Sequence, residues 1–280
     1  MIIYKKTSDI IDLLATIRSS GARIGFIPTM GALHQGHISL IKKARGNAEF
    51  TLCSIFVNPT QFNDPVDFQK YPATLEQDIN LLELAACDLL FLPDLNEIYL
   101  DGTKNLPHYQ LGDLENLLEG KYRKGHFQGV CQVVHRLLNI VHPDHLYLGQ
   151  KDYQQCLVIN KLIALFRFNT TTLICPTLRE KDGLAMSSRN LRLSAADRQQ
   201  AKRLFETLTF VKNEIRPGYL EDIKERAKQY LQTEGFKVDY FEIANKQTLE
   251  PVETWDGHQP LVALVAAFLN EVRLIDNILI

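Results

Sequence analysis

Apolar runs that fit buried strands alternate with helical patterns over the first 176 residues, and this alternation constrains the fold more than any other feature. The runs that predict strands are 23–27, 50–57, 89–92, 145–148 and 171–174. The segments that predict helices are 38–44, 130–141, 153–166 and a helix that Thr74 and Gln77 open as a capping box and that runs to Ala86. Alternating strands and helices form a parallel sheet covered on both faces, so we expect a doubly wound α/β domain over residues 1–176.

The alternation stops after Pro176. Ser194 with Asp197 predicts the start of a long helix, and residues 221–232 predict a second one. Three strand patterns then follow one another, at 238–243, 261–268 and 272–277. Helices and strands grouped in this way are typical of an α+β domain. We therefore expect a smaller C-terminal α+β domain over residues 177–280.

Composition excludes several other classes of protein. A chain of 280 residues with 45% hydrophobic content can bury a large core, and 31 Lys and Arg against 33 Asp and Glu leave no basic surplus for nucleic acid. The longest apolar run, Leu261–Leu269, is too short to span a membrane, and the N-terminus lacks the pattern of a secretory signal. The five cysteines are scattered, so we expect reduced core residues in a cytoplasmic protein.

The segment after the first strand, Pro28–His37, is rich in residues that could contact a nucleotide. Gly31 and Gly36 have the spacing of a P-loop, but His37-Ile38 stands where that motif has Lys followed by Ser or Thr. The dinucleotide pattern Gly-x-Gly-x-x-Gly is also absent, which weighs against a nicotinamide enzyme. The segment is therefore neither a Walker A motif nor a dinucleotide fingerprint.

What remains is His34-x-Gly36-His37 at the start of a helix. A helix N-terminus offers free N–H groups and a partial positive charge, which favour a bound polyphosphate, and two imidazoles can donate hydrogen bonds to its oxygens. Two other interpretations stay open from the motif alone: a loop histidine pair without a role, or half of a metal site. The pair His142 and His145 shows the same spacing at an ordinary loop.

Three more loops follow predicted strands, where ligands bind in sheets of this kind. Asn58–Phe62 fits either a binding loop or a simple Asn-Pro turn. In Gly149–Gln155, Gly149 permits close backbone approach, Lys151 offers a cation, and Asp152 can cap a helix or bind a ribose, although a solvated Lys-Asp pair is the alternative. The polar segment 179–190 predicts a lid or a flexible linker, and Ser187, Ser188 and Arg189 could close over a polyphosphate.

Together these segments closely resemble the pantothenate synthetase (pantoate-beta-alanine ligase) family, within the nucleotidyltransferase superfamily. The matching stretches are Pro28–His37, Phe56–Phe62, His126–Val130, Gly149–Gln155 and Arg179–Asn190. His-x-Gly-His alone marks the superfamily, whereas Val-Asn-Pro-x-Gln-Phe, Lys-Asp-x-Gln-Gln and Met-Ser-Ser-Arg-Asn mark this family. The chain departs from the common family pattern at Ala73, Leu148, Arg192 and 63–67.

The resemblance implies a Rossmann-like nucleotidyltransferase fold and a ligase that joins pantoate to beta-alanine through a pantoyl adenylate, consuming ATP and releasing AMP and pyrophosphate. It implies His34, His37, Lys151 and Arg189 as catalytic residues, with His37 as the best candidate for proton donor. The residues that it implies for ATP binding are Met30, Gly31, Ala32, Leu33, His34, Gln35, Gly36, His37, Gly149, Gln150, Lys151, Asp152, Leu178, Met186, Ser187, Ser188 and Arg189. Gln61 and Gln155 are implied for pantoate and beta-alanine, and Asn58 more weakly.

The resemblance further implies Mg²⁺ carried on the ATP phosphates, no tightly bound cofactor and a homodimer formed through the N-terminal domain. Small molecules are the expected partners, without nucleic acid or membrane. Two rival functions remain: another adenylyl transferase of the superfamily, which would lack the Gln61 and Gln155 pair, and a non-catalytic nucleotide sensor on the same fold.

Overall fold

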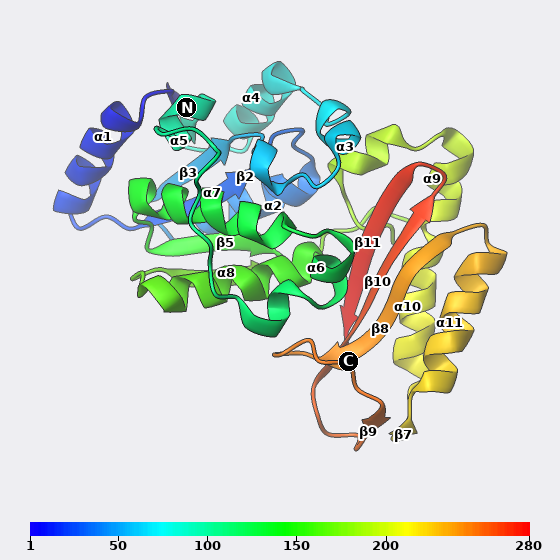
Figure 1. Ribbon diagram of the computed structural model, residues 1–280. Coiled ribbons are helices and arrows are strands. Elements are labelled where there is room, and N and C mark those ends of the chain that lie inside the picture. The colour runs from blue at the N-terminus through cyan, green and yellow to red at the C-terminus, as the bar shows by residue number, and fades with distance from the viewer.

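Six strands form one parallel sheet in the order β1-β4-β3-β2-β5-β6. The computed structural model describes residues 1–280 and shows this sheet at the centre of the larger part of the molecule (Figure 1). The strands are β1 (Ile2–Tyr4), β2 (Ile24–Thr29), β3 (Phe50–Ile55), β4 (Leu89–Phe91), β5 (His145–Gly149) and β6 (Thr171–Cys175). Each neighbouring pair is parallel, as the alternation of strands and helices predicts.

Helices cover both faces of this sheet because side chains alternate along each strand. Phe26 and Leu52 pack with α1 (Thr7–Ser19), α7 (His126–Val141) and α8 (Tyr153–Phe166) on one face. Their chain neighbours Ile27 and Cys53 pack with α2 (Gln35–Arg45) and α4 (Leu75–Leu84) on the other face. The predicted doubly wound α/β fold is confirmed.

Short helices follow or connect the strands at the edge where ligands bind. They are η1 (Pro59–Gln61), α3 (Pro65–Gln69), α5 (Leu95–Ile98), η2 (Gly112–Glu115), α6 (Leu118–Tyr122), η3 (Gln150–Asp152) and η4 (Ser188–Arg192). Such short elements leave many backbone N–H groups outside regular structure, so side chains and neighbouring loops must satisfy them.

The C-terminal part is built on an antiparallel sheet in the order β11-β10-β8. Its strands are β8 (Lys237–Asn245), β10 (Leu261–Leu269) and β11 (Val272–Leu279), and a small pair, β7 (Gly218–Tyr219) and β9 (Thr254–Trp255), lies beside it. Helices α9 (Ala195–Ala201), α10 (Arg203–Glu214) and α11 (Glu221–Thr233) pack on one face, and the other face packs against the larger part through Leu118 and Tyr153. The predicted α+β grouping is confirmed, and the division at residue 176 stays a prediction.

Several predicted details are wrong. Thr74 does not form a capping box, because its hydroxyl donates to Asp78 instead of capping α4. Ser194 caps a helix through the N–H of Asp197, but that helix ends at Ala201 and α10 begins after Lys202, so there is no single long helix. Strand β1 was missed because it is a three-residue edge strand with Ile2 and Ile3 exposed. Helix α1 was missed as well, although Ile10, Leu14 and Ile17 form its buried face.

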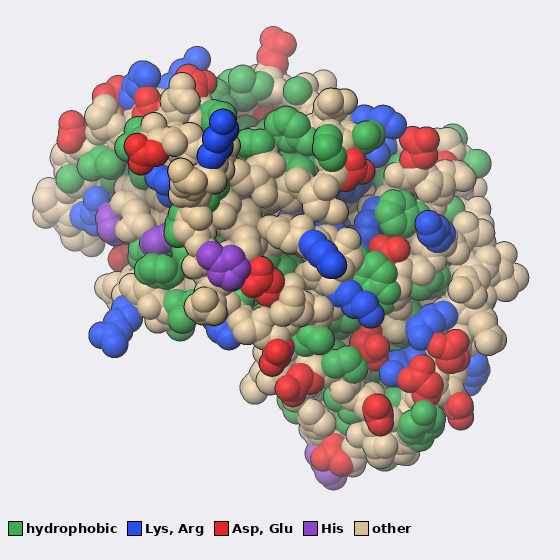
Figure 2. Space-filling view, in the orientation of Figure 1, with side chains coloured by type: hydrophobic (Ala, Val, Ile, Leu, Met, Phe, Trp, Pro, Cys, Tyr) green, Lys and Arg blue, Asp and Glu red, His purple; other side chains and the backbone are tan.

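The surface carries both signs of charge. Figure 2 shows lysines and arginines interspersed with aspartates and glutamates over the visible face. All five cysteines are buried and free, as predicted. None of the helices combines the length and apolar character that crossing a bilayer would require.

Candidate active site

A cavity of about 220 Å³ lies beyond the carboxyl ends of β2 and β5, between the parallel sheet and the segment after β6. This is the edge at which open α/β sheets bind ligands. The structure brings most of the predicted site residues together around this cavity: Met30, His34, Gly36, His37, Gln61, Gly149, Lys151, Asp152, Gln155, Leu178, Met186, Ser187, Ser188 and Arg189.

The two motif histidines hold each other in place at the N-terminus of α2. The N–H of Gly36 donates to Nδ1 of His34 at 3.1 Å, and the N–H of His34 donates to Nδ1 of His37 at 3.3 Å. The imidazole centroids lie 4.1 Å apart. Because each Nδ1 accepts a hydrogen bond, the proton of each neutral ring is on Nε2, where it can be donated to a ligand.

Both histidines are neutral at physiological pH. Burial is the largest cause, and it lowers the pKa of His34 to about 3 and that of His37 to about 4. The neighbouring imidazole also lowers the pKa of His34, and the Lys151 ammonium lowers both. A bound triphosphate would act in the opposite direction, since negative charge favours the protonated imidazole.

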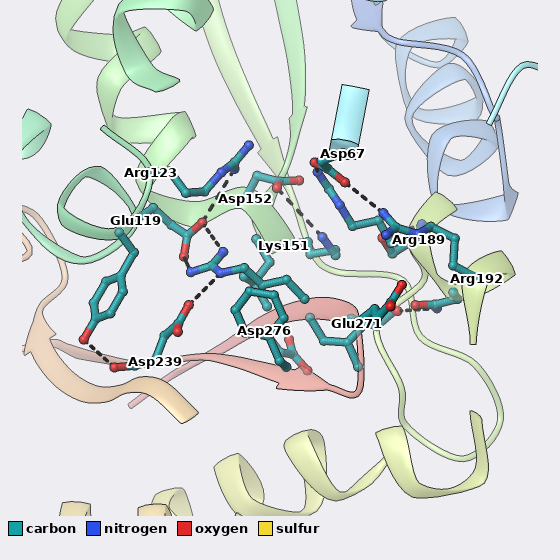
Figure 3. A pocket seen from close by; sticks show the side chains of 18 of the residues that line it. Asp67, Glu119, Arg123, Lys151, Asp152, Arg189, Arg192, Asp239, Glu271 and Asp276 are labelled. Carbon is teal, nitrogen blue, oxygen red and sulfur yellow. Dashed lines mark hydrogen bonds and ion pairs between the residues drawn. The ribbon is translucent and has the colours of Figure 1, made fainter. Parts of the chain in front are cut away.

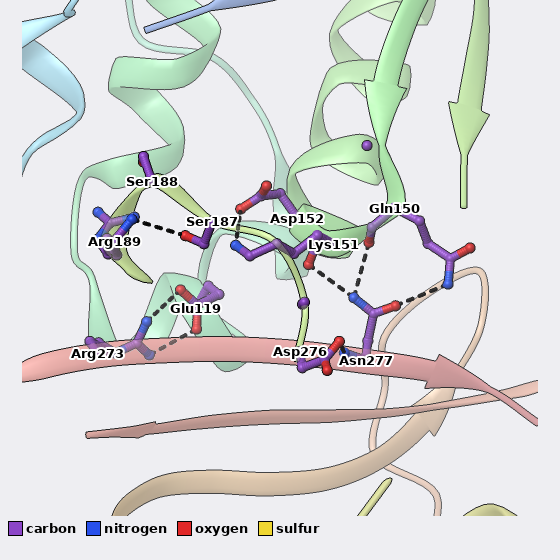
Figure 4. A network of polar contacts seen from close by, with 12 residues as sticks. Glu119, Gln150, Lys151, Asp152, Ser187, Ser188, Arg189, Arg273, Asp276 and Asn277 are labelled. Carbon is purple, nitrogen blue, oxygen red and sulfur yellow. Dashed lines mark hydrogen bonds and ion pairs between the residues drawn. The ribbon is translucent and has the colours of Figure 1, made fainter. Parts of the chain in front are cut away.

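Lys151 brings a cation into the cavity from η3. Its side chain is only 15% exposed, and Nζ lies 3.8 Å from Oδ1 of Asp152. The amide of Asn277 in β11 donates to the carbonyls of Gln150 and Lys151, so the C-terminal sheet fixes this turn (Figure 4). Asp152 does not cap α8 with its side chain, contrary to one of the predicted roles, and lines the cavity instead.

The loop before the histidines is anchored by Asp78, which the sequence interpretation missed. Gly31 and Ala32 have left-handed backbone conformations with φ of 78° and 49°. The N–H groups of Ala32 and Leu33 then point to one carboxylate, that of Asp78 in α4, at 2.9 and 2.7 Å. Successive N–H groups of this kind form an anion site, and here the buried Asp78 fills it.

Gln61 occupies the cavity wall next to Met30, and Asn58 holds it there. Nδ2 of Asn58 donates to Oε1 of Gln61 at 3.2 Å and to the carbonyl of Gly129 at 3.0 Å. A Cβ atom on Gly129 would lie 2.3 Å from the carbonyl oxygen of Thr60, so only glycine allows α7 to approach this loop. Asn58 does not line the cavity, which makes it a support for Gln61.

The segment after β6 is folded against the rest of the molecule and is not a free linker. Arg179 pairs through two nitrogens with the buried Asp276, at 2.6 and 3.0 Å. Arg189 and Arg192 each donate to the carboxylate of Asp67 at 2.8 Å. These contacts tie residues 179–192 to both β11 and α3.

An apolar wall completes the cavity and was not part of the predicted site. It is formed by Phe56, Val130, Val133, Val134 and Leu137. The four α7 residues belong to the helical pattern that predicts core packing, and nothing in that pattern indicates that one edge of this face borders a ligand cavity. Tyr71, whose hydroxyl lies 3.5 Å from Oγ of Ser188, is a further lining residue that was missed.

Five predicted ATP-binding residues do not line this cavity. Gly31 and Ala32 line a separate, mainly apolar cavity with Asp78, and Gln150 bonds Asn277. Leu33 and Gln35 do not line either cavity. ATP contacts by these five residues stay predictions.

A second cavity, of about 460 Å³, adjoins the first between the two parts of the chain (Figure 3). Lys151, Asp152, Ser187 and Arg189 border both. Charged side chains of both signs line the second cavity and are mostly paired with one another, as Arg273 is with Glu119 and Asp239. A long, charged ligand could therefore extend from one cavity into the other.

The arrangement suits transfer chemistry on a polyphosphate. Neutral imidazole N–H groups, an ammonium, a guanidinium and two hydroxyls converge without any carboxylate cage for a metal, and no cluster of three His, Cys, Asp or Glu side chains could hold one. Such donors stabilise charge that develops on phosphoryl oxygens. The amides of Gln61 and Gln155 can hydrogen bond a polar substrate without acting as nucleophiles.

Comparisons with known proteins agree with this geometry. The family model described as pantoate-beta-alanine ligase matches residues 2–279. The chain is 42% identical over 270 residues to a pantothenate synthetase of Cytophaga hutchinsonii, with 95% of each chain covered. A crystal structure of pantothenate synthetase from Thermus thermophilus has a TM-score of 0.90 and 37% identity over 99% of each chain.

The pantoate-beta-alanine ligase of Francisella tularensis, complexed with beta-gamma ATP and beta-alanine, is similarly related. It has a TM-score of 0.83 and 39% identity, and the match covers 100% of this chain and 97% of that one. The family match and these relatives extend over nearly the whole length. The chain therefore belongs to the pantoate-beta-alanine ligase family.

Proposed function

We propose that the cavity at the His-x-Gly-His helix carries out the ATP-dependent condensation of pantoate with beta-alanine, with a pantoyl adenylate as the intermediate. The observation that carries this proposal is the convergence of His34, His37 and Lys151 on one cavity that also contains Gln61 and Gln155. ATP requires hydrogen-bond donors for its phosphates, and a polar carboxylate substrate requires neutral amides. This one cavity contains both kinds of group.

In the first step a pantoate carboxylate oxygen forms a bond to the α-phosphorus of ATP. The bond from that phosphorus to the bridging oxygen breaks, and pyrophosphate leaves. The carboxylate is already ionised at neutral pH, so this step needs no general base. The chain contributes position and charge stabilisation, with His37, His34, Lys151 and Arg189 as the hydrogen-bond donors. His37 is the candidate proton donor in its protonated form, which the negative charge of the bound triphosphate favours.

In the second step the amine nitrogen of beta-alanine attacks the acyl carbon of the adenylate. The new C–N bond forms as the C–O bond to AMP breaks, and the ammonium group of beta-alanine gives up two protons. The adenylate is prone to hydrolysis, so the well-anchored segment 179–192 serves a second purpose by limiting access of water.

The remaining substrate contacts follow from the lining of the cavity. Adenosine contacts Met30, Gly149, Asp152, Leu178 and Met186, with Ser187 and Ser188 at the phosphates. Gln61 and Gln155 hydrogen bond pantoate. Pantoate carries two methyl groups, and the apolar wall of α7 with Phe56 offers the surface that would bury them.

Further features belong to the same proposal. Mg²⁺ enters on the ATP phosphates, in keeping with its preference for phosphate and water oxygens. Residues 1–176 and 177–280 act as a binding domain and a covering domain. Two chains associate through the N-terminal part, where Leu84 and Leu100 are 86% and 78% exposed, and light scattering of the purified protein tests this. A cytoplasmic location stays a prediction.

Exchange of labelled pyrophosphate into ATP tests the proposed reaction. The wild-type chain should catalyse exchange with pantoate present and not without it, and adding beta-alanine should then yield AMP and pantothenate. Exchange that needs no pantoate, or transfer that yields no AMP, would favour another adenylyl transferase. Nucleotide binding without exchange under any condition would favour a sensor.

A further inference from the structure

Arg123 is a mostly buried arginine whose hydrogen-bonding capacity is largely unused. It follows α6, its side chain is 16% exposed, and it lines the second cavity. Only Nη1 has protein partners: it donates to Nε2 of His126 at 3.1 Å and lies 3.6 Å from Oε2 of Glu119. A guanidinium has five N–H donors, so Nε and Nη2 of Arg123 remain available to a ligand.

The carboxylate nearest to Arg123 is already occupied by another residue. Both oxygens of Glu119 accept from Arg273 at 2.8 Å, and Oε1 also accepts from the Tyr240 hydroxyl. Figure 3 shows the end of the Arg123 side chain between Glu119, to which a dashed line joins it, and Asp152. Burial lowers the pKa of Arg123, and the neighbouring Arg189 and Arg273 act in the same direction, while Glu119 opposes them.

A short chain of hydrogen bonds connects Arg123 to the expected pantoate site. Nδ1 of His126 lies 2.7 Å from the carbonyl of Gln61, so this nitrogen carries the proton and Nε2 accepts from Arg123. Arg123 also lines a small third cavity together with Gln155. Yet Arg123 does not line the cavity of His34 and His37, where the triphosphate is expected.

The position of Arg123, near Gln61 and Gln155 but outside the expected triphosphate site, fits the carboxylate of beta-alanine. In beta-alanine the carboxylate carbon is three bonds from the nitrogen, so it must lie beside the pantoyl group and apart from the phosphates. Arg189 and Arg192 hydrogen bond Asp67, and Arg273 hydrogen bonds Glu119 and Asp239, whereas Arg123 makes no hydrogen bond to a carboxylate and its nearest one lies 3.6 Å away. A planar guanidinium matches a carboxylate through two parallel hydrogen bonds.

We propose that Arg123 binds the carboxylate of beta-alanine and so sets the specificity of the second half-reaction. This inference rests on the proposed function, because it requires a pantoyl adenylate that an amine attacks. The unused donors then form the anchor that holds the amine at the acyl carbon. His126 orients the anchor and is a positioning residue.

Two variants and a matched control test the proposal with two separate assays. Arg123→Gln removes the charge, Arg123→Lys keeps the charge without the planar fork, and Lys124→Gln removes the charge of the exposed neighbouring residue. Pantoate-dependent pyrophosphate exchange reports the first half-reaction alone. Amide formation is then measured with beta-alanine and with propylamine, which has no carboxylate.

For Arg123→Gln we expect pyrophosphate exchange close to the wild-type rate and a KM for beta-alanine that rises about 10- to 100-fold, the range for a lost charged hydrogen-bond pair. The preference for beta-alanine over propylamine should fall by a similar factor, which a purely structural role would not cause. Arg123→Lys should lie between wild type and Arg123→Gln, and Lys124→Gln should match the wild type.

An unchanged KM for beta-alanine and an unchanged preference over propylamine in either arginine variant would overturn the proposal. So would a loss of pyrophosphate exchange equal to the loss of amide formation, because Arg123 would then act in the first step or in folding. If Arg123→Gln is not folded by circular dichroism, Arg123→Lys decides by the same criteria. Failure of the wild-type exchange reaction, by contrast, would reject the proposed function itself.

Discussion

Nη2 of Arg189 donates a 2.8 Å hydrogen bond to Oδ2 of Asp67, which joins the segment after β6 to helix α3. Arg192 donates to the other oxygen of the same carboxylate at 2.8 Å. The arginine expected at the triphosphate is therefore oriented before ATP arrives. Orienting a charged donor in advance reduces the entropy that binding would otherwise cost.

Asp67→Asn should raise the KM for ATP about 3- to 10-fold and change kcat less, because Arg189 loses the ion pair that orients it. Steady-state kinetics with saturating pantoate measure this. Arg198→Gln is the control, since it removes the ion pair that Arg198 of α9 makes with Asp182 of the segment 179–192 and does not touch Asp67. Equal KM values for ATP in Asp67→Asn and wild type would show that the Asp67 contact does not orient Arg189.

Asp78→Asn should weaken both the fold and ATP use. An amide offers one acceptor oxygen where the carboxylate now accepts the N–H groups of Ala32 and Leu33 with separate oxygens, so one buried donor loses its partner. We expect a loss of about 1–3 kcal/mol in the free energy of unfolding and a higher KM for ATP. Urea unfolding measures the first quantity, with exposed Glu76→Gln on the same helix as control. A loss no greater than that of the control would contradict this role.

The histidines predict how stability depends on pH. The pKa of His37 is about 4 in the folded protein, against about 6.5 for an unfolded chain, so the unfolded state binds the proton more strongly between these values. Stability of the free enzyme should therefore rise with pH through this window. The free energy of unfolding of the wild type should be higher at pH 7 than at pH 5, and His37→Gln should reduce this difference by about 1–2 kcal/mol. The exposed His258→Gln serves as control, and identical pH profiles for His37→Gln and wild type would refute the prediction.

Gln155→Ala should chiefly impair pantoate use. The Gln155 side chain lines the first cavity, with the two histidines and the apolar wall, and it carries no positive charge to bind the ATP phosphates. We expect the KM for pantoate to rise about 10-fold or more, as for a lost pair of substrate hydrogen bonds, with little change in the KM for ATP. If pantoate kinetics stay at wild-type values while ATP kinetics worsen, Gln155 belongs to the nucleotide site instead.

Much of the parallel sheet was predictable because buried strands and amphipathic helices leave strong periodic signals. Strands β2 to β6 and helices α7 and α8 lie close to their predicted ranges. Strand β1 was missed because it has only three residues, two of them exposed, which is too few to show a period. The break at Lys202 was missed because no Pro or Gly marks it. These features depend on tertiary contacts that sequence spacing does not encode.

The site shows the same division between local motifs and long-range contacts. His34, His37 and Lys151 stand in local motifs at strand ends, so topology alone brings them together. Asp78 meets the loop at Ala32 from another helix, and Arg123 reaches Gln61 only through His126. Asp67 and Asp276 pair with arginines more than ninety residues away along the chain. Such pairs follow from the packed fold, and no short motif indicates them.

The most direct test is single-turnover release of pyrophosphate from labelled ATP, with pantoate and without beta-alanine, in wild type, His37→Ala and Lys151→Ala. Both variants should keep the wild-type circular dichroism spectrum while pyrophosphate release slows about 100-fold or more, the usual effect of losing a donor that stabilises developing charge. Pyrophosphate release at the wild-type rate in either variant would contradict the claim that these two side chains stabilise the charge that develops during adenylation.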